Sequence, residues 1–252
     1  MSADVLEAGG WGLLAGSALL IGAVVGYFGR ISNRMVAAVM AFGSGVLLSA
    51  VSFELIAEAH DQGGMVPTTV GAVSGAVIYT GANLVLAARG ARHRKRSGGQ
   101  QPSETDQAGS GTAIALGALL DGIPESIVIG TSLLGGGTVS TVTVAAVFIS
   151  NVPEGLSSAS GMRRARRGRT YVFGLWGAIA VISAAAAMLG YGLLGGAPPA
   201  LLAAITALAG DAILTMIADT MIPEAFEDAQ LWIGPITVAG FLTAFALSHL
   251  GH

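Results

Sequence analysis

Two stretches of the chain place a proline and a glutamate inside an otherwise apolar run: DGIPES, which begins at Asp121, and SNVPEG, which begins at Ser150. Residues three or four apart lie on one face of an α-helix. Asp121 and Glu125 therefore share a face of one helix. On the next helix, Ser150 and Asn151 lie four and three residues before Glu154. Each helix is predicted to present a column of oxygen donors.

The prolines add backbone oxygens to these columns. A proline inside a helix removes one hydrogen bond and pushes away the carbonyl four residues earlier. For Pro124 and Pro153 these carbonyls belong to Leu120 and Ile149. The sequence thus predicts two kinked helices that pool Asp121, Glu125, Asn151 and Glu154 around a positively charged ion. The alternative is that the prolines are kinks for packing and the acids are protonated hydrogen-bond partners.

The composition is that of a membrane protein. Of the 252 residues, 53% are hydrophobic and 11% are charged, whereas a soluble domain carries about 25% charged residues. The absence of cysteine excludes disulfides, thiolate metal sites and cysteine nucleophiles. The first residues lack the positive region of a cleaved signal peptide. We expect an all-α membrane protein in which residues 1–252 form a single transmembrane domain.

Eight segments are apolar enough over about 20 residues to cross a bilayer as helices. They are residues 9–29, 35–58, 67–88, 111–134, 138–161, 170–194, 198–222 and 230–250. Carboxylates recur in them, although a charge at bilayer centre costs about 2.5–3.5 kcal/mol on insertion scales. These acids are Glu54, Glu58, Asp121, Glu125, Glu154, Asp211, Asp219 and Glu224. Because no Lys or Arg lies in the spans, we expect the acids to be protonated, to face a wet cavity or to hold a cation.

The basic residues predict an orientation. All twelve Lys and Arg fall in three loops: Arg30 and Arg34 in the first, five in residues 89–96 and five in residues 163–169. Since Lys and Arg accumulate in cytoplasmic loops, the first, third and fifth loops are expected inside the cell and both termini outside. The segment 89–110 is basic and then rich in Ser, Gly and Gln, so it is expected to be a flexible cytoplasmic loop.

An internal repeat relates the two halves of the chain. Residues 43–59 (GSGVLLSAVSFELIAEA) align with residues 209–225 (AGDAILTMIADTMIPEA) at a constant offset of 166. The second and seventh spans would run in opposite directions, which is the signature of an inverted 3+2+3 repeat. Glu58 then matches Glu224, and both are expected to be ordinary interfacial acids or to lie at the mouths of a pore.

These motifs resemble those of the ZIP (Zrt/Irt-like) family of divalent metal transporters, especially its bacterial zinc-uptake branch. In that family both segments typically read His-Asn-x-Pro-Glu-Gly, in the fourth and fifth of eight spans. The metal motif here is degenerate, because Asp121 and Ser150 replace the histidines and the sixth span lacks a bridging acid. The resemblance implies a single metal site, with Asp121, Glu125, Ser150 and Glu154 nearest the ion and Asn151 beside it.

The ligand types bear on the choice of metal. Imidazole suits zinc and iron, whereas an oxygen-only set suits harder ions such as manganese or magnesium. The resemblance implies zinc, iron or manganese as the transported substrate, in a multi-pass protein of the cell (inner) membrane that contacts lipid and forms a possible homodimer. No Walker-type phosphate loop occurs, and we expect no enzyme activity, organic cofactor or nucleic-acid partner. The alternatives are a transport-inactive ZIP-like sensor and a carrier of another small cation.

Overall fold

The computed structural model describes residues 3–29, 31–96, 100–134, 140–229 and 232–250. Every regular element within those ranges is helical. The elements are α1 (Ala3–Phe28), α2 (Asn33–Ala50), η1 (Val51–Ile56), α3 (Ala57–Gly63), α4 (Met65–Leu86), η2 (Ala87–Ala91), α5 (Ser110–Thr131), α6 (Thr141–Arg164), α7 (Arg169–Leu194), α8 (Pro199–Met216), η3 (Ile217–Met221), α9 (Ile222–Ala229) and α10 (Ile233–Leu250). Here η denotes a π-helical turn.

Several of these elements run on without a break, so the described chain forms eight helical rods at the positions of the eight predicted segments. Six stretches are long and apolar enough to cross a membrane: Ala3–Phe28, Asn33–Gly63, Met65–Ala91, Ser110–Thr131, Arg169–Leu194 and Pro199–Glu227. Of the other two rods, α6 is rich in serine and α10 is short. The expected fold class is thereby confirmed at the level of an all-helical, multi-pass membrane protein.

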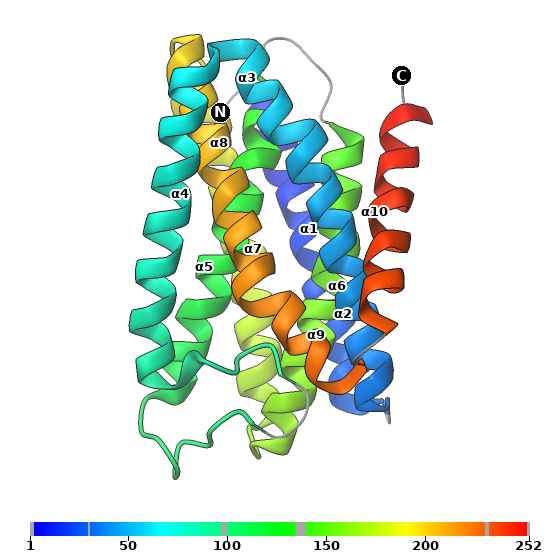
Figure 1. Cartoon of the computed structure of the whole chain (residues 1–252). Coiled ribbons are helices and arrows are strands. Elements are labelled where there is room, and N and C mark those ends of the chain that lie inside the picture. Colours follow the sequence, from blue (N-terminus) through cyan, green and yellow to red (C-terminus); the bar gives the residue numbers. More distant parts are fainter. Residues whose placement is uncertain (1–2, 30, 97–99, 135–139, 230–231, 251–252) are drawn as a thin grey trace.

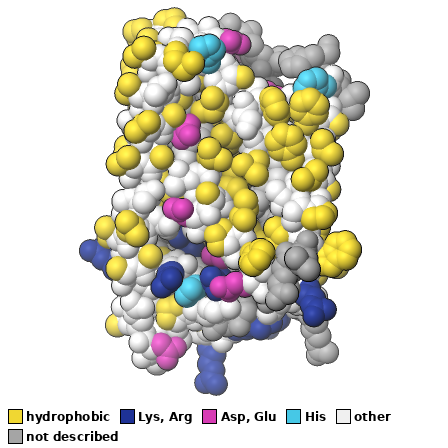
Figure 2. All heavy atoms as spheres, viewed as in Figure 1, with side chains coloured by type: hydrophobic (Ala, Val, Ile, Leu, Met, Phe, Trp, Pro, Cys, Tyr) yellow, Lys and Arg dark blue, Asp and Glu magenta, His cyan; other side chains and the backbone are white. Residues whose placement is uncertain are grey.

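The surface of the bundle supports this class. Large apolar side chains are exposed along the outer faces of the rods; on α4, for example, Val66, Val77 and Leu84 are 73%, 65% and 66% exposed. Hydrophobic side chains spread over the face in Figure 2, whereas Lys and Arg gather towards one end. An exposed apolar surface of this extent is what a lipid-facing protein presents.

The first and last rods have their outer ends at the same end of the bundle (Figure 1). In Figure 1, α1 begins and α10 ends at the same end, and the chain between α4 and α5 lies at the opposite end. We call this opposite end the basic end, because the residues 31–34, 89–96 and 163–169 all lie there. The rod of α2, η1 and α3 runs away from the basic end, and the rod of α8, η3 and α9 runs towards it.

Packing follows the repeat found in the sequence. α4 packs on α8 as α10 packs on α2; α1 packs on α6 as α7 packs on α5; and α2 packs on α6 as α8 packs on α5. The repeat relates α1 to α7, the rod of α2 to the rod of α8, α4 to α10, and α5 to α6. Under this correspondence, the two contacts in each pair are equivalent. Two of the three π-helical turns obey the same rule, since η1 and η3 begin 166 residues apart, at Val51 and Ile217.

Glycine permits a close approach of α1 and α6. A Cβ atom built on Gly22 of α1 would collide with the carbonyl oxygen of Val152, and one built on Gly155 of α6 would collide with that of Leu19. Small residues let backbones approach in this way in membrane bundles. This contact fixes α6, and with it the Pro153–Glu154 motif, against α1.

The chain between α4 and α5 turns back into the bundle. Gly90 has a φ of 101°, in the left-handed region that favours glycine. The turn directs the following residues inwards, so that Arg94, Lys95 and Gln101 are only 2%, 1% and 4% exposed. These three residues belong to the segment 89–110, which we expected to be a flexible loop. That expectation stays a prediction for the segment as a whole, but Arg94, Lys95 and Gln101 are packed into the protein.

Candidate functional site

Asp121 of α5 is held by a dense set of hydrogen bonds. Arg94 donates from Nε to Oδ2 at 2.9 Å and from Nη2 to Oδ1 at 2.8 Å, and Tyr79 of α4 donates from its hydroxyl to Oδ1 at 2.5 Å. The same guanidinium also donates to the Tyr79 hydroxyl at 2.9 Å and to Asn83 Oδ1 at 2.8 Å. A two-pronged contact between arginine and a carboxylate is strong and geometrically specific. Asp121 is therefore mainly occupied in fixing Arg94.

Lys95 joins the two proline-containing helices. Its Nζ lies 3.0 Å from Glu154 Oε2 on α6 and 3.3 Å from Asp121 Oδ2 on α5. The backbone carbonyl of Lys95 accepts a hydrogen bond from the Ser157 hydroxyl. Gln101 Nε2 donates to the carbonyl of Arg94 at 2.8 Å. The segment is thus held by its backbone, and the ammonium is placed between two buried carboxylates.

The charge on Lys95 is stabilised by its neighbours. Burial disfavours the ammonium form, but Asp121 and Glu154 outweigh this effect, so the pKa of Lys95 is raised above its ordinary value. The pKa of Arg94 is likewise raised: burial opposes the charge and Asp121 more than compensates. Both side chains are therefore cations at neutral pH.

Glu125 lies one turn of α5 away from Asp121 and is 2% exposed. Its Oε1 atom has no hydrogen-bond partner within the described part of the chain. It is close enough to Glu154, Lys95 and Asp121 to interact electrostatically with all three. Three carboxyl groups therefore face two basic groups in this centre, and Glu125 is the acid with no direct ion pair among the described residues.

The two other predicted ligands are differently oriented. The Ser150 hydroxyl donates to the carbonyl of Val147 in its own helix at 2.9 Å. The Asn151 amide donates to the carbonyl of Ala15 in α1 at 3.0 Å. Both residues are buried on α6, but Asn151 is engaged with α1. The structure thus brings Asp121, Glu125 and Glu154 together.

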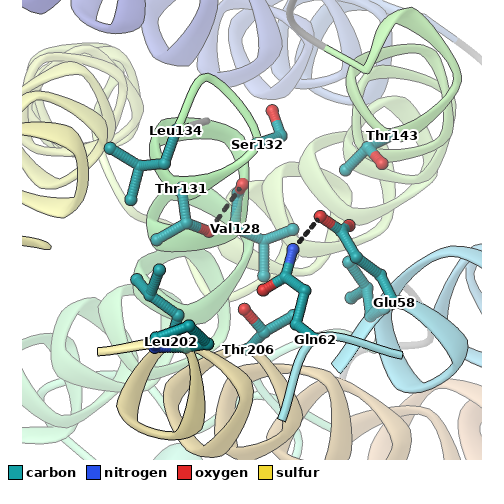
Figure 3. A pocket seen from close by; sticks show the side chains of 11 residues that line it. Glu58, Gln62, Val128, Thr131, Ser132, Leu134, Thr143, Leu202 and Thr206 are labelled. Carbon is teal, nitrogen blue, oxygen red and sulfur yellow. Dashed lines mark hydrogen bonds between the residues drawn. The ribbon is translucent and has the colours of Figure 1, made fainter. Parts of the chain in front are cut away.

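A vestibule opens at the end of the bundle opposite the basic end. It has a volume of about 350 Å³ and lies between α3, α5, α6 and α8. Figure 3 shows Glu58 and Gln62 at its side, joined by a hydrogen bond of 2.7 Å from the amide to the carboxylate. Val128 of α5 also lines it, three residues beyond Glu125 on the same helix face. One face of α5 therefore leads from the vestibule to the carboxylates.

A much smaller pocket of about 10 Å³ lies at the basic end, barely the space of one water molecule. Its lining repeats that of the vestibule. Adding the offset of 166 to Val36, Met40 and Glu58 gives Leu202, Thr206 and Glu224, and the 29 residues between the proline motifs relate Val128 to Ser157. The vestibule is lined by Glu58, Val128, Leu202 and Thr206, and the small pocket by Glu224, Ser157, Val36 and Met40. The two are counterparts, one wide and the other narrow and lined in part by Lys95.

The expectation that no Lys or Arg neutralises the buried acids is wrong. It treated residues 89–96 as a solvated loop, whereas Gly90 turns Arg94 and Lys95 into the centre. Tyr79 was missed as well, because an aromatic residue in an apolar run has no distinct signal. Lys95 is distinguished in the sequence, because it is the single lysine among twelve basic residues. Among the residues that the structure describes, no three His, Cys, Asp or Glu side chains are arranged to hold a metal ion.

Comparisons with known proteins add no identification. No family model matches the chain, and no curated protein sequence matches it. The chemical interpretation of the centre therefore depends on its geometry: buried carboxylates of two helices, compensated by one fixed guanidinium and one ammonium on a flexible stem.

Proposed function

We propose that this protein is a secondary carrier that moves a divalent metal cation of the zinc, iron or manganese class across the cell (inner) membrane, through a centre between α5 and α6. One observation carries the proposal: Glu154 is compensated by the ammonium of Lys95, and Glu125 beside it has an oxygen without a partner in the described chain. Burying two carboxylates in this way costs free energy unless they bind a cation.

The topology we propose has eight membrane spans with both termini outside. In support, the two rods that are short or serine-rich pack within the same bundle as the six apolar ones. The basic end would face the cytoplasm by the rule that Lys and Arg stay inside. On this orientation the vestibule with Glu58 opens to the outside, and the small pocket with Glu224 faces the cytoplasm.

The matched pockets support an alternating-access mechanism. In an inverted repeat, the two halves exchange roles when the carrier reorients. The open vestibule would then close as its counterpart at the basic end opens, and the cargo would reach Glu125 and Glu154 first from one side and then from the other. The apolar residues Val51 and Ile217, which the repeat relates, belong to one buried cluster between the ends.

The donors in the centre favour a hard cation. Asp121, Glu125, Ser150, Asn151 and Glu154, our proposed ligand set, offer oxygen alone, which suits manganese better than a site with histidine would. The family resemblance favours zinc. We therefore propose that selectivity for zinc over manganese is weak, with the metal as substrate, no organic cofactor and no enzymatic reaction, in a protein that contacts lipid and can form a homodimer.

Uptake by reconstituted vesicles tests the proposal. The wild-type protein should accumulate radioactive zinc or manganese. Glu125→Ala and Glu154→Ala should each abolish uptake while the protein still inserts, since each removes a carboxylate from the centre. Glu7→Ala, at an exposed position of α1, serves as the matched control and should transport normally. Wild-type rates in both centre variants would exclude this route for the ion.

A transport-inactive sensor is the second candidate. The observation that favours it is that Arg94 and Lys95 already form ion pairs with Asp121 and Glu154. Metal-dependent thermal stabilisation of the purified protein, together with no vesicle uptake, would point to the sensor. Proton movement without metal dependence would instead indicate a carrier of another small cation.

A further inference from the structure

We propose that Lys95 is a tethered occupant of the cargo site: its ammonium rests between Asp121 and Glu154 while the carrier is empty, and cargo binding displaces it to Glu224. This inference rests on the proposed transport function and names how the site is regulated. It makes Lys95 a determinant of affinity and charge selectivity.

The first argument is the position of the ammonium. Nζ of Lys95 lies within 3.3 Å of carboxylates from both proline-containing helices, and its side chain is 1% exposed. These are the helices that the sequence predicted to share a cation. A positive charge is therefore already held at the predicted place, but it is attached to the chain.

The second argument is the difference between the two basic residues. The guanidinium of Arg94 is fixed by Asp121, Tyr79 and Asn83, which together use its planar set of donors. Lysine is a point charge on a stem of four flexible carbons. Lys95 is therefore suited to move its charge between two carboxylates, and Arg94 is suited to hold its charge in one place.

The third argument is a second place for the ammonium. Glu224 of α9 lines the small pocket at the basic end together with Lys95. Its Oε2 atom is buried and has no hydrogen-bond partner within the described residues. The backbone of Lys95 is anchored through Ser157, so the side chain can swing while the segment stays in place. Glu224 would receive the ammonium that leaves Glu154.

The arrangement discriminates by charge. At the same distance from the carboxylates, a monovalent ion gains the attraction that the ammonium gave up, whereas a divalent ion gains about twice as much by Coulomb's law. The displaced ammonium remains paired at Glu224. Sodium should therefore compete poorly, and Glu154 should stay paired with Lys95 while the empty carrier returns.

Metal binding by the purified protein tests the inference without transport. Thermal unfolding in detergent is followed as manganese is added to wild type, Lys95→Ala, Lys95→Met and Arg92→Ala. Both Lys95 variants should respond at about tenfold lower manganese concentration, a typical coupling between two ligands. Arg92→Ala removes a charge from the same segment at an exposed position and should match wild type. Lys95→Met keeps the length of the side chain if Lys95→Ala fails to fold.

Three results of this titration would overturn the inference. They are an unchanged manganese midpoint in the Lys95 variants, an equal gain in Arg92→Ala, and a gain that persists when Glu154→Gln is added to Lys95→Met.

Chemical labelling of the wild-type protein provides an independent measurement. Lys95 carries the only side-chain amine in the chain, so an amine-reactive ester followed by peptide mass spectrometry reports on it alone. Labelling should be slow without metal and faster with manganese, with no change from sodium. Equal labelling with and without manganese would overturn the inference.

The two proposals can fail separately. Manganese-dependent labelling of Lys95 without vesicle uptake would uphold the displacement and refute transport. Uptake that depends on Glu154 while Lys95 labelling ignores manganese would uphold transport and refute the displacement.

Discussion

Arg94 holds Asp121 with two hydrogen bonds, from Nε at 2.9 Å and Nη2 at 2.8 Å, although the two residues belong to different segments and both are buried. Removing one partner of a buried ion pair leaves the other charge uncompensated, at a cost of about 3–5 kcal/mol. Arg94→Ala should therefore lower the thermal stability of the purified protein strongly. Arg94→Lys should rescue it only in part, because lysine cannot reproduce the two-pronged contact. A melting temperature for Arg94→Ala equal to that of Arg92→Ala would contradict this role.

The turn at Gly90 should be required for the packed state of the segment. Its φ of 101° is unfavourable for any residue with a Cβ, and a Cβ there would also press on Ser110 Cβ and Gln107 Oε1, both at 2.9 Å. Gly90→Ala should thus loosen the segment and expose Lys95 to amine-reactive reagents. Gly109→Ala is a useful comparison, since it has a similar φ of 82° but open space around it. Slow labelling of Lys95 in Gly90→Ala would show that the turn is not needed.

Glu104 should make a stability contribution that depends on pH. Hydrogen bonds from the backbone N–H groups of Gly109 and Gly111, at 2.8 and 2.6 Å, lower the pKa of this carboxyl below its ordinary value of 4.5. A depressed pKa in the folded state stabilises the protein above the unfolded value, and the contribution is lost as pH falls through the folded value. The melting temperature of Glu104→Gln should therefore lie below that of wild type at pH 7. The difference should shrink below about pH 4.5; a difference independent of pH would contradict the assignment.

The matched pockets give a labelling experiment on a chain that has no native cysteine. Thr206 lines the wide vestibule, and its counterpart Met40 lines the small pocket at the basic end. In metal-free protein, Thr206→Cys should react with a soluble maleimide much faster than Met40→Cys. If the carrier alternates between its two ends, manganese should raise the reactivity at position 40 and lower it at position 206. Reactivities that rise together would argue for a channel open at both ends.

The positions of the rods could be predicted from the sequence, since a bilayer demands long apolar runs. Their ends were harder to place. The fifth span was expected at 138–161, of which residues 138 and 139 lie outside the described part of the chain, whereas α6 covers Thr141–Arg164. Its start is set by Ser140, whose hydroxyl accepts the N–H of Thr143, and its end includes Arg163 and Arg164, which favour a helix C-terminus. Such local hydrogen bonds and charges have little effect on hydropathy.

The centre could be predicted only in part. The spacing of Asp121, Glu125 and Glu154 identified the acids, because helix periodicity is a local property. Nothing local indicated that Lys95, 59 residues before Glu154 in the sequence, reaches the same point. That contact depends on a single left-handed turn at Gly90 and on hydrogen bonds from Ser157 and Gln101. Long-range pairs of this kind arise from the packing of the whole bundle.

The π-helical turns η1 and η3 have a mechanical consequence. The hydrogen bond of a π-helical turn encloses one residue more than that of an α-helical turn. If the position of this extra residue shifts along the rod, the part of the rod beyond it rotates by about 100° and moves by about 1.5 Å. Beyond η1 lies α3 with Glu58, and beyond η3 lies α9 with Glu224. Each mouth of the proposed passage thus ends in a short helix, α3 or α9, that can rotate about its own axis. Such a rotation would move Glu58 or Glu224 into or out of the passage while the helices in the middle of the bundle keep their packing.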